Sequence, residues 1–138
     1  MPLTLEIVTP EKKVFKDAQI DAVLLTTTDG EIEILPGHIP LLTTLQPGEI
    51  RLVKGDEKIF LAVDKGFARV FGDVVSVLAE AAIDVKYIDE KAIEQAQKEA
   101  EDALKAARTQ KDIDPAEIEK LESVARFAIL QRLIKKKR

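Results

Sequence analysis

The sequence has no cysteine and no tryptophan, and it has a single histidine and a single tyrosine among 138 residues. Without cysteine the chain forms neither a disulfide nor a thiolate zinc site, which is typical of a reducing compartment. No apolar run approaches the roughly 18 residues that a membrane-spanning helix requires. The N-terminus shows the pattern of neither a signal peptide nor a transit peptide. We therefore expect a chain that stays where it is made and does not insert into a membrane.

The same scarcity leaves little from which to build an enzyme. One histidine and no cysteine provide no nucleophilic triad, and the sequence has no Gly-x-Ser-x-Gly, Walker A or Gly-x-Gly-x-x-Gly motif. His38 lies near Glu31 and Glu33, but this spacing matches no recognised set of metal ligands. An acidic body with 4% aromatic residues does not favour nucleic-acid binding. We expect a binding and coupling protein without catalytic residues, metal or nucleic-acid partner.

Apolar residues are abundant enough for a core, at 46% of the chain, and charged residues make up 33%. These values fit one domain, or a small domain with an appendage. The net charge of −4 is unevenly distributed, because residues 124–138 contain six basic residues and no acidic one. The basic residues are Arg126, Arg132, Lys135, Lys136, Lys137 and Arg138. Such an end favours an acidic partner, although a solvated, frayed tail is the alternative for the last four residues.

Up to about residue 84 the sequence is rich in β-forming residues. Turn dipeptides such as Asp29-Gly30 and Gly55-Asp56 separate the runs. Strands are expected at residues 3–8, 20–28, 49–54, 59–63, 67–70 and 74–79. Short strands at this spacing, with no long helical pattern between them, are typical of an antiparallel sandwich or barrel. We assign residues 1–86 to such a domain.

From residue 88 the apolar period lengthens to between three and four residues, which indicates helices. Asp89 is a suitable N-cap for a helix over about 89–108, and Asp114 precedes a second helix over about 114–135. Residues 109–113 break the pattern between them. Residues 87–138 therefore predict an antiparallel helical hairpin. The fold class is α+β, with a β-sandwich or barrel followed by the hairpin.

The two expected helices differ in the apolar residues that they offer. The first presents mainly alanines, so the helices can approach closely while burying little area, and the hairpin should be only marginally stable. The second carries more apolar residues than one stripe needs. The additional ones are Val124, Phe127, Leu130 and Ile134. They predict either docking on the β-domain or binding to another protein in an opened state.

Residues 29–48 hold three of the six prolines and three of the six glycines, yet isoleucine and leucine run through them. Glycine permits positive φ, and proline fixes φ near −65°. This combination predicts an ordered series of short strands and turns. Such a segment either shapes a site or presents a surface.

Residues 30–48 read Gly-Glu-Ile-Glu-Ile-Leu-Pro-Gly-His-Ile-Pro-Leu-Leu-Thr-Thr-Leu-Gln-Pro-Gly. This stretch resembles the pattern of the epsilon subunit of rotary F-type ATP synthases, in which an acidic glycine turn precedes Leu-Pro-Gly-His-x-Pro-Leu-Leu-Thr and a later Leu-x-Pro-Gly. Gly66-Phe67 and the Val77–Glu80 run before the helices agree with the same family. The resemblance extends over essentially the whole chain. One departure is Asp64-Lys65-Gly66, where the family often has a pair of glycines.

The resemblance implies a non-catalytic subunit of the central stalk. In this family the β-sandwich binds the gamma subunit and rests on the ring of c subunits. Glu31, Pro36, Gly37 and His38 are therefore expected to contact the c-ring and gamma. The resemblance further implies a proton-translocating complex at the cytoplasmic face of a bacterial inner membrane rather than a thylakoid membrane. The alternative is a free-standing adaptor whose helical arm binds an acidic protein.

The resemblance also assigns a role to the hairpin. Folded beside the sandwich it permits turnover, and extended along gamma it obstructs ATP hydrolysis. Its basic second helix then meets acidic segments of the alpha/beta hexamer. The candidates for this inhibitory contact are Arg126, Arg132, Lys135 and Lys136.

Some bacterial members bind ATP in the folded hairpin through an Ile/Leu-Asp-x-x-Arg-Ala motif. Ile88 and Asp89 match this motif, but Ala92 stands at the arginine position and Ile93 follows it. Ile88, Asp89 and Arg126 are the positions that the resemblance offers for a nucleotide. Because the arginine of the motif is absent, we expect weak or no binding of ATP and no other cofactor.

Overall fold

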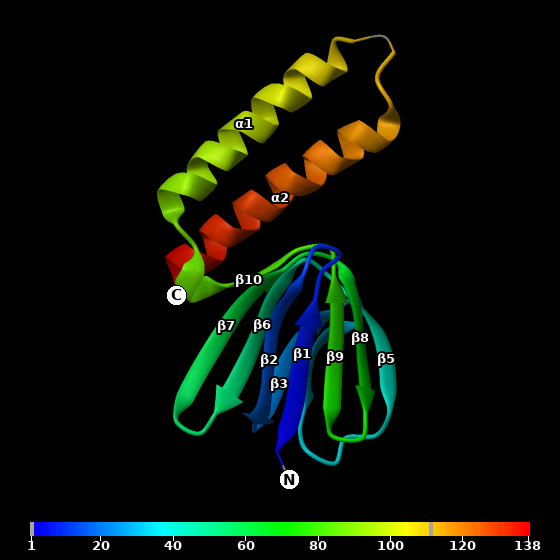
Figure 1. Ribbon diagram of the computed structural model, residues 1–138, viewed down its shortest axis with the longest axis vertical. Coiled ribbons are helices and arrows are strands. Elements are labelled where there is room, and N and C mark those ends of the chain that lie inside the picture. The colour runs from blue at the N-terminus through cyan, green and yellow to red at the C-terminus, as the bar shows by residue number, and fades with distance from the viewer. Residues whose placement is uncertain (1, 111) are drawn as a thin grey trace. The chain divides into compact units, whose positions relative to one another are not determined.

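The first part of the chain folds into strands that hydrogen-bond into one continuous sheet, and the second part folds into two helices (Figure 1). The computed structural model describes residues 2–110 and 112–138. Met1, in the expected β-domain, and Lys111, in the expected break between the helices, lie outside the described residues. The chain divides into two units, Met1–Tyr87 and Ile88–Arg138, one residue after the expected boundary.

Within the described residues, the first unit has ten strands. They are β1 (Leu3–Val8), β2 (Lys13–Ile20), β3 (Ala22–Thr27), β4 (Gly30–Ile34), β5 (Leu41–Leu45), β6 (Gly48–Lys54), β7 (Glu57–Val63), β8 (Gly66–Phe71), β9 (Val74–Ala79) and β10 (Ala82–Asp84). Their order in the sheet is β10-β7-β6-β3-β5-β8-β9-β1-β2, and β4 pairs with β3. A short 3-10 helix, Val85–Tyr87, follows β10.

The sheet curls into two facing walls (Figure 1). One wall contains β1, β5, β8 and β9, and the other contains β3, β4, β6 and β7. Successive side chains of a strand point to opposite faces, so alternate residues of both walls meet in the middle. Their side chains form one apolar cluster, in which Leu5, Ile50 and Leu61 have no exposed surface. The expected sandwich or barrel followed by two helices is confirmed.

One strand pair departs from the expected antiparallel arrangement. β1 and β9 run parallel, with Leu5 beside Val75 and Ile7 beside Val77. Parallel neighbours require a long connection, and here the strands from β2 to β8 supply it. Alternation of apolar and polar residues carries no information about strand direction, so the sequence could not reveal this pair.

Polar contacts bring β2 against β6 of the opposite wall. Asp21 connects β2 to β3, and next to the β3–β6 pairing its N donates to Val53 O at 2.8 Å while its Oδ2 accepts from Gly55 N at 2.7 Å. Lys54 Nζ lies 2.8 Å from Asp17 Oδ2. These contacts nearly close the curled sheet into a barrel.

The second unit contains α1 (Glu90–Arg108) and α2 (Pro115–Lys137). The carboxylate of Asp89 caps α1, and that of Asp114 caps α2 by accepting from Ala116 N at 2.9 Å. α2 continues two residues beyond the expected end at 135. The lysines of this last turn favour continued helix, because cations stabilise the negative end of the helix dipole.

Small residues join the two helices. Ala100, Leu104 and Ala125 are buried in one cluster, with Ile118 and Leu121 packed against it. Val124, Ile129 and Leu133 of α2 remain exposed. Over the described residues, neither helix combines the length and apolar character needed to cross a membrane.

Candidate functional site

The proline- and glycine-rich segment 29–48 contains β4 and β5, which are joined by a tight turn. Gly30 begins β4 with a φ of 114°, and its carbonyl accepts a hydrogen bond from Thr27 Oγ1 at 2.6 Å. In the turn, Gly37 has a φ of 85°, and His38 N donates to Leu35 O at 3.1 Å. Positive φ is a conformation that glycine adopts without steric cost. The segment is therefore an ordered series of strands and turns.

The four residues expected to dock on partners do not form one compact site. Glu31 lies near the start of β4, whereas Pro36, Gly37 and His38 follow its end. At about 3.3 Å per residue, the strand separates Glu31 from Pro36 by roughly 15 Å. The structure thus divides the expected docking residues between the two ends of β4, within the first unit, Met1–Tyr87, which we call the β-unit.

Glu31 belongs to a charged cluster on the outer side of its wall. Arg51 on β6 lies between two carboxylates, with Nη2 2.7 Å from Glu31 Oε1 and Nε 3.4 Å from Glu49 Oε1. Glu33 is also exposed on β4. One guanidinium between these carboxylates leaves the outer side of β4 acidic.

His38 is half-buried, and its ring contacts the backbone of its own turn. Nδ1 lies 2.7 Å from Ile39 O, so Nδ1 carries the proton and donates this bond. Over residues 2–110 and 112–138, no group of three histidine, aspartate or glutamate side chains is placed to hold a metal ion. His38 therefore helps to define the turn between β4 and β5.

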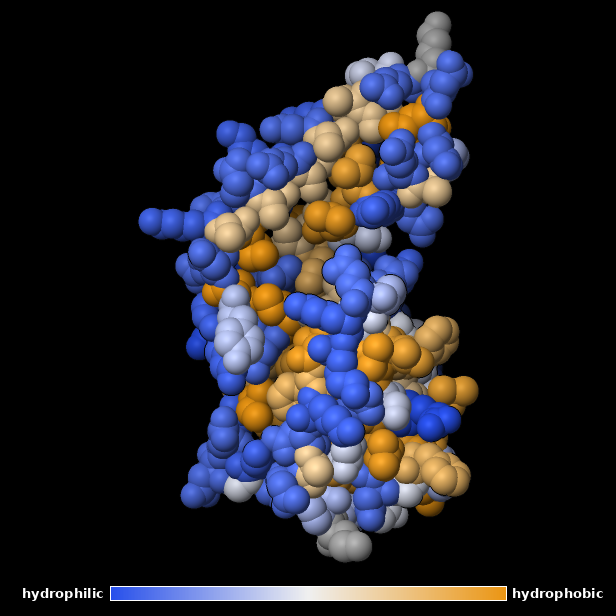
Figure 2. All heavy atoms as spheres, in the orientation of Figure 1, coloured by the Kyte–Doolittle hydropathy of each residue, from blue (hydrophilic) through white to orange (hydrophobic). Residues whose placement is uncertain are grey.

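A surface that periodicity did not reveal lies on the outer side of β5, β8 and β9. Its large apolar side chains and their exposed fractions are Leu42 (71%), Phe67 (54%), Phe71 (68%), Val74 (42%) and Leu78 (59%). The strand register places Phe67 beside Leu78 and Phe71 beside Val74. Figure 2 shows apolar side chains gathered over these strands. We call these five residues the apolar face.

Strand β8 explains why the sequence did not reveal the apolar face. Its inward residues, Ala68 and Val70, are apolar, and its outward residues are Phe67 and Phe71 with Arg69 between them. A strand with apolar residues on both sides reads as a fully buried strand. Periodicity therefore predicts the strand but not that its largest side chains point outward.

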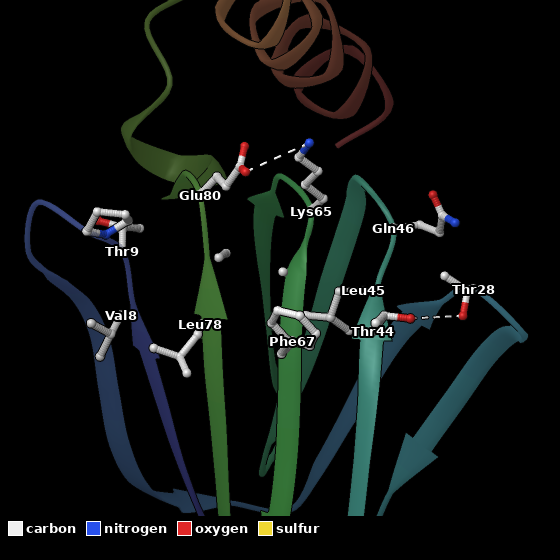
Figure 3. A pocket seen from close by; sticks show the side chains of 13 residues that line it. Val8, Thr9, Thr28, Thr44, Leu45, Gln46, Lys65, Phe67, Leu78 and Glu80 are labelled. Atoms are coloured by element: carbon white, nitrogen blue, oxygen red, sulfur yellow. Dashed lines mark hydrogen bonds and ion pairs between the residues drawn. The ribbon is translucent and has the colours of Figure 1, made fainter. Parts of the chain in front are cut away.

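An open groove of about 810 Å³ continues the apolar face toward the ends of β1 and β9. Val8, Leu78 and Phe67 lie in a row across β1, β9 and β8 along this groove (Figure 3). Polar residues border it, namely Thr28, Thr44, Lys65 and Glu80. An apolar centre with a polar rim is typical of a surface that docks another protein.

Three of the four candidate inhibitory residues lie along the second half of α2, namely Arg126, Lys135 and Lys136. Arg126 Nη2 contacts Ser123 Oγ of the same helix at 3.2 Å. Lys135 and Lys136 lie in the last turn of α2, and Lys136 is exposed. The end of α2 therefore presents concentrated positive charge.

Arg132, the fourth candidate, reaches across to α1. Its Nη1 donates to Gln97 Oε1 at 2.7 Å, and its Nη2 lies 3.4 Å from Glu94 Oε1. The guanidinium thus connects the two helices in the closed hairpin.

The three residues offered for a nucleotide are not brought together. Asp89 Oδ1 accepts hydrogen bonds from Lys91 N at 3.0 Å and Ala92 N at 3.3 Å, so this carboxylate is engaged as a helix cap. Contacts at both ends of the hairpin set Arg126 opposite the middle of α1. At 1.5 Å per residue, Arg126 is roughly 20 Å from Asp89 along the helix axis. Ile88, next to Asp89, is buried.

Comparison with known proteins places these features in a family. Residues 2–85 match the family model described as the ATP synthase delta/epsilon chain, beta-sandwich domain. The chain is 37% identical to ATP synthase epsilon chain 2 of Ralstonia nicotianae, with both chains covered completely. It is 38% identical to the ATP synthase epsilon chain of Hydrogenovibrio crunogenus, over 95% of this chain and 90% of that one. The epsilon chain of Herpetosiphon aurantiacus is 41% identical over 86% of both.

Solved structures share the fold. A chain in the cryo-EM structure of the Euglena gracilis mitochondrial ATP synthase, OSCP/F1/c-ring, aligns with a TM-score of 0.66 at 23% identity, covering 99% of this chain and 82% of that chain. A chain in the central stalk and c-ring structure of the Tetrahymena thermophila mitochondrial ATP synthase aligns with a TM-score of 0.55 at 15% identity. The latter alignment covers 98% of this chain and 97% of that one.

The match of the β-unit and the full-length relatives agree on one family. The chain therefore belongs to the ATP synthase epsilon-chain family, as a non-catalytic accessory subunit.

Proposed function

We propose that this epsilon chain couples the gamma subunit to the c-ring through its β-unit and inhibits ATP hydrolysis by the alpha/beta hexamer through its hairpin. The complex is a proton-translocating ATP synthase, and the chain is held peripherally at the cytoplasmic face of a bacterial inner membrane. The proposal includes no resident cofactor. The observation that carries it is the apolar face.

The apolar face is the docking surface for gamma. Contiguous exposed apolar patches on soluble proteins commonly mark interaction sites, and aromatic side chains often contribute most of the binding energy. Phe67 and Phe71 are more than half exposed and stand beside Leu78 and Val74 respectively. A helical partner laid across β5, β8 and β9 would bury all of these side chains.

The turn at Pro36–His38 extends the same contact. It leads directly into β5, whose second residue is Leu42 of the apolar face. Glu31 lies at the other end of β4, in the acidic cluster with Arg51. We therefore assign the turn to the gamma contact and Glu31 to polar groups of the c-ring.

The hairpin supplies the inhibitory contact. Arg126, Lys135 and Lys136 present positive charge along the second half of α2, which faces acidic segments of the hexamer in the extended state. The limited apolar packing between the helices keeps folded and extended states close in free energy, as a switch requires.

Co-purification tests the docking role. Immobilised epsilon chain should recover gamma and, with it, the alpha/beta hexamer. Failure to retain purified gamma would remove the main support for the proposal. A variant truncated after Tyr87 keeps the whole β-unit and should bind gamma equally well.

Truncation also tests inhibition. ATP hydrolysis should be faster in a reconstituted complex that carries residues 1–87 than in one that carries the full chain. Equal rates would show that this hairpin does not inhibit.

A further inference from the structure

The hairpin is packed unevenly along its length. In α1 the buried side chains are Ala100, Leu104 and Ala107, and all belong to its second half. Between Glu90 and Glu99 the helix buries none of the described side chains. We call the region where α1 begins and α2 ends the open end of the hairpin. Ile93 and Ala96 are only half-buried in this part of α1, although the last part of α2 buries Ala128 and Ile134. On α1, apolar packing is therefore densest near the connecting loop, and polar contacts contribute relatively more at the open end.

Arg132 is the side chain that spans the open end. It donates to Gln97 Oε1 at 2.7 Å, and its other terminal nitrogen lies 3.4 Å from Glu94 Oε1. Two hollows of about 390 Å³ each lie in this region, and Arg132, Glu94 and Gln97 line both. The guanidinium therefore crosses the groove between the helices and divides it in two.

A second interhelical ion pair lies at the other end, where Arg108 Nη2 is 3.3 Å from Glu122 Oε1. That pair is close to the apolar cluster, so its loss leaves packing to hold the helices. Near Arg132 the apolar side chains of α1, Ile93 and Ala96, are only half-buried. Opening of the hairpin from its open end therefore has to break the contact that Arg132 makes with α1.

We propose that Arg132 is a switch residue with two exclusive partners. In the closed hairpin its guanidinium binds Glu94 and Gln97, and in the extended state the same group binds a carboxylate of the alpha/beta hexamer. The first half of this proposal stands on the hairpin alone, while the second half rests on the proposed function.

The charge of the Arg132 guanidinium is paired both before and after the exchange of partners. Both states give the guanidinium charge-assisted hydrogen bonds to a carboxylate, so neither leaves a charge unpaired. Extension of the hairpin moves α2 away from α1, so Arg132 cannot keep its contacts with Glu94 and Gln97 while α2 binds the hexamer. Such a contact biases the equilibrium without locking it. Because the pair is partly exposed, its removal should change the open-to-closed ratio about two- to fivefold.

Spin-label distances test the closed-state contact directly. The chain has no cysteine, so Lys91→Cys and Lys137→Cys place two labels uniquely at the open end of the isolated full-length protein. In this background, Glu94→Ala with Gln97→Ala should raise the separated population two- to fivefold, and Arg132→Ala should do the same.

A matched control exists on the same helix. Gln95 Nε2 bonds Glu99 Oε1 within α1 at 3.0 Å, so Gln95→Ala with Glu99→Ala removes the same two residue types without touching Arg132. This control should leave the distance distribution unchanged. If the Glu94→Ala with Gln97→Ala variant gives the same distance distribution as the native chain, the closed-state role of Arg132 is overturned.

ATP hydrolysis by the reconstituted complex tests the second partner. Glu94→Ala with Gln97→Ala frees Arg132 and should strengthen inhibition, whereas Arg132→Ala opens the hairpin equally but should inhibit less than the native chain. Equal inhibition by these variants would overturn the second role. If removal of residues 88–138 leaves hydrolysis unchanged, the proposed function fails while the spin-label result stands.

Discussion

Lys54 Nζ on β6 donates a hydrogen bond to Asp17 Oδ2 on β2 at 2.8 Å, and so joins strands from opposite sides of the curled sheet. This bond, together with one from Gln19 N, holds the pKa of the Asp17 carboxyl below its usual value of 3.8. The same bond raises the pKa of Lys54 above 10.5. The charged forms of both groups therefore stabilise the nearly closed barrel.

The Asp17 contact predicts a pH-dependent stability. Because the pKa of Asp17 is lowered by folding, its contribution is present above its unfolded value of about 3.8 and is lost as pH falls through the folded value. We expect Asp17→Asn to lower the melting temperature at pH 7, and the gap between variant and native chain to narrow at pH 3. Circular dichroism melting at both pH values measures this. Glu11→Gln, in the exposed turn after β1, is the control. A gap of the same size at both pH values would contradict the assignment.

Gly66 predicts a steric requirement at the start of β8. A methyl group at this position would overlap Leu78 O and would lie 2.8 Å from Ala79 Cα, and both are backbone atoms of β9. We expect Gly66→Ala to destabilise the fold by about 1–3 kcal/mol, because the strands must move apart. Urea unfolding measures the change. Gly48→Ala is the control, since its methyl group would meet only the side chain of Thr26, at 3.4 Å. Equal losses in both variants would refute this explanation.

The apolar face predicts variants that separate binding from stability. Phe67→Ser with Leu78→Ser changes two largely exposed side chains, so unfolding free energy should remain within about 1 kcal/mol. Binding to gamma should weaken at least about tenfold, since both side chains would lose their buried contacts. Surface plasmon resonance with purified gamma measures the affinity. Glu33→Ser with Lys58→Ser, on the other wall, is the matched control and should bind normally. If the variant changed at Phe67 and Leu78 binds gamma normally, the apolar face is not the gamma contact.

The start of α1 predicts a cap rather than a nucleotide site. Asp89 Oδ1 already accepts two backbone hydrogen bonds, and Ala92 offers no cation for a phosphate. Isothermal titration should show no saturable binding at micromolar ATP, and Asp89→Ala should destabilise the hairpin by about 1 kcal/mol. Ala92→Arg restores the arginine of the motif and is the variant in which any affinity should appear. A micromolar dissociation constant for the native chain would contradict this prediction.

Periodicity was sufficient for much of the fold, and its failures have physical causes. The run at 49–54 is β6, and the run at 20–28 contains β3, which begins only at Ala22. β2 was not anticipated, because half of its residues are polar and only Ile20 is buried, as on a strand with one open side. The position of β5 within residues 29–48 was not predicted, because the strand begins directly after Pro40. Local patterns identify elements that bury one face, and they miss those that mainly satisfy backbone hydrogen bonds.

The candidate site likewise has features that local sequence predicts and features that it does not. The turn at Gly37 follows from its residue types, since positive φ and a fixed proline angle are local properties. The apolar face depends on which side of β8 turns inward, and that is decided by the packing of the opposite wall. The contact between Arg132 and Glu94 depends on the register of two helices. Such relationships join residues far apart in the sequence, so no window of neighbouring residues contains them.

The parallel pairing of β1 with β9 has a consequence for synthesis. Leu5 pairs with Val75, so β1 cannot pair with β9 until 70 more residues have been made. At about 5–20 residues per second, this delay lasts roughly 4–14 s. During that time β2 is the sole neighbour that β1 can have, because it follows directly in the chain. The barrel should therefore be completed late in translation, in one step that places β1 and β9 together.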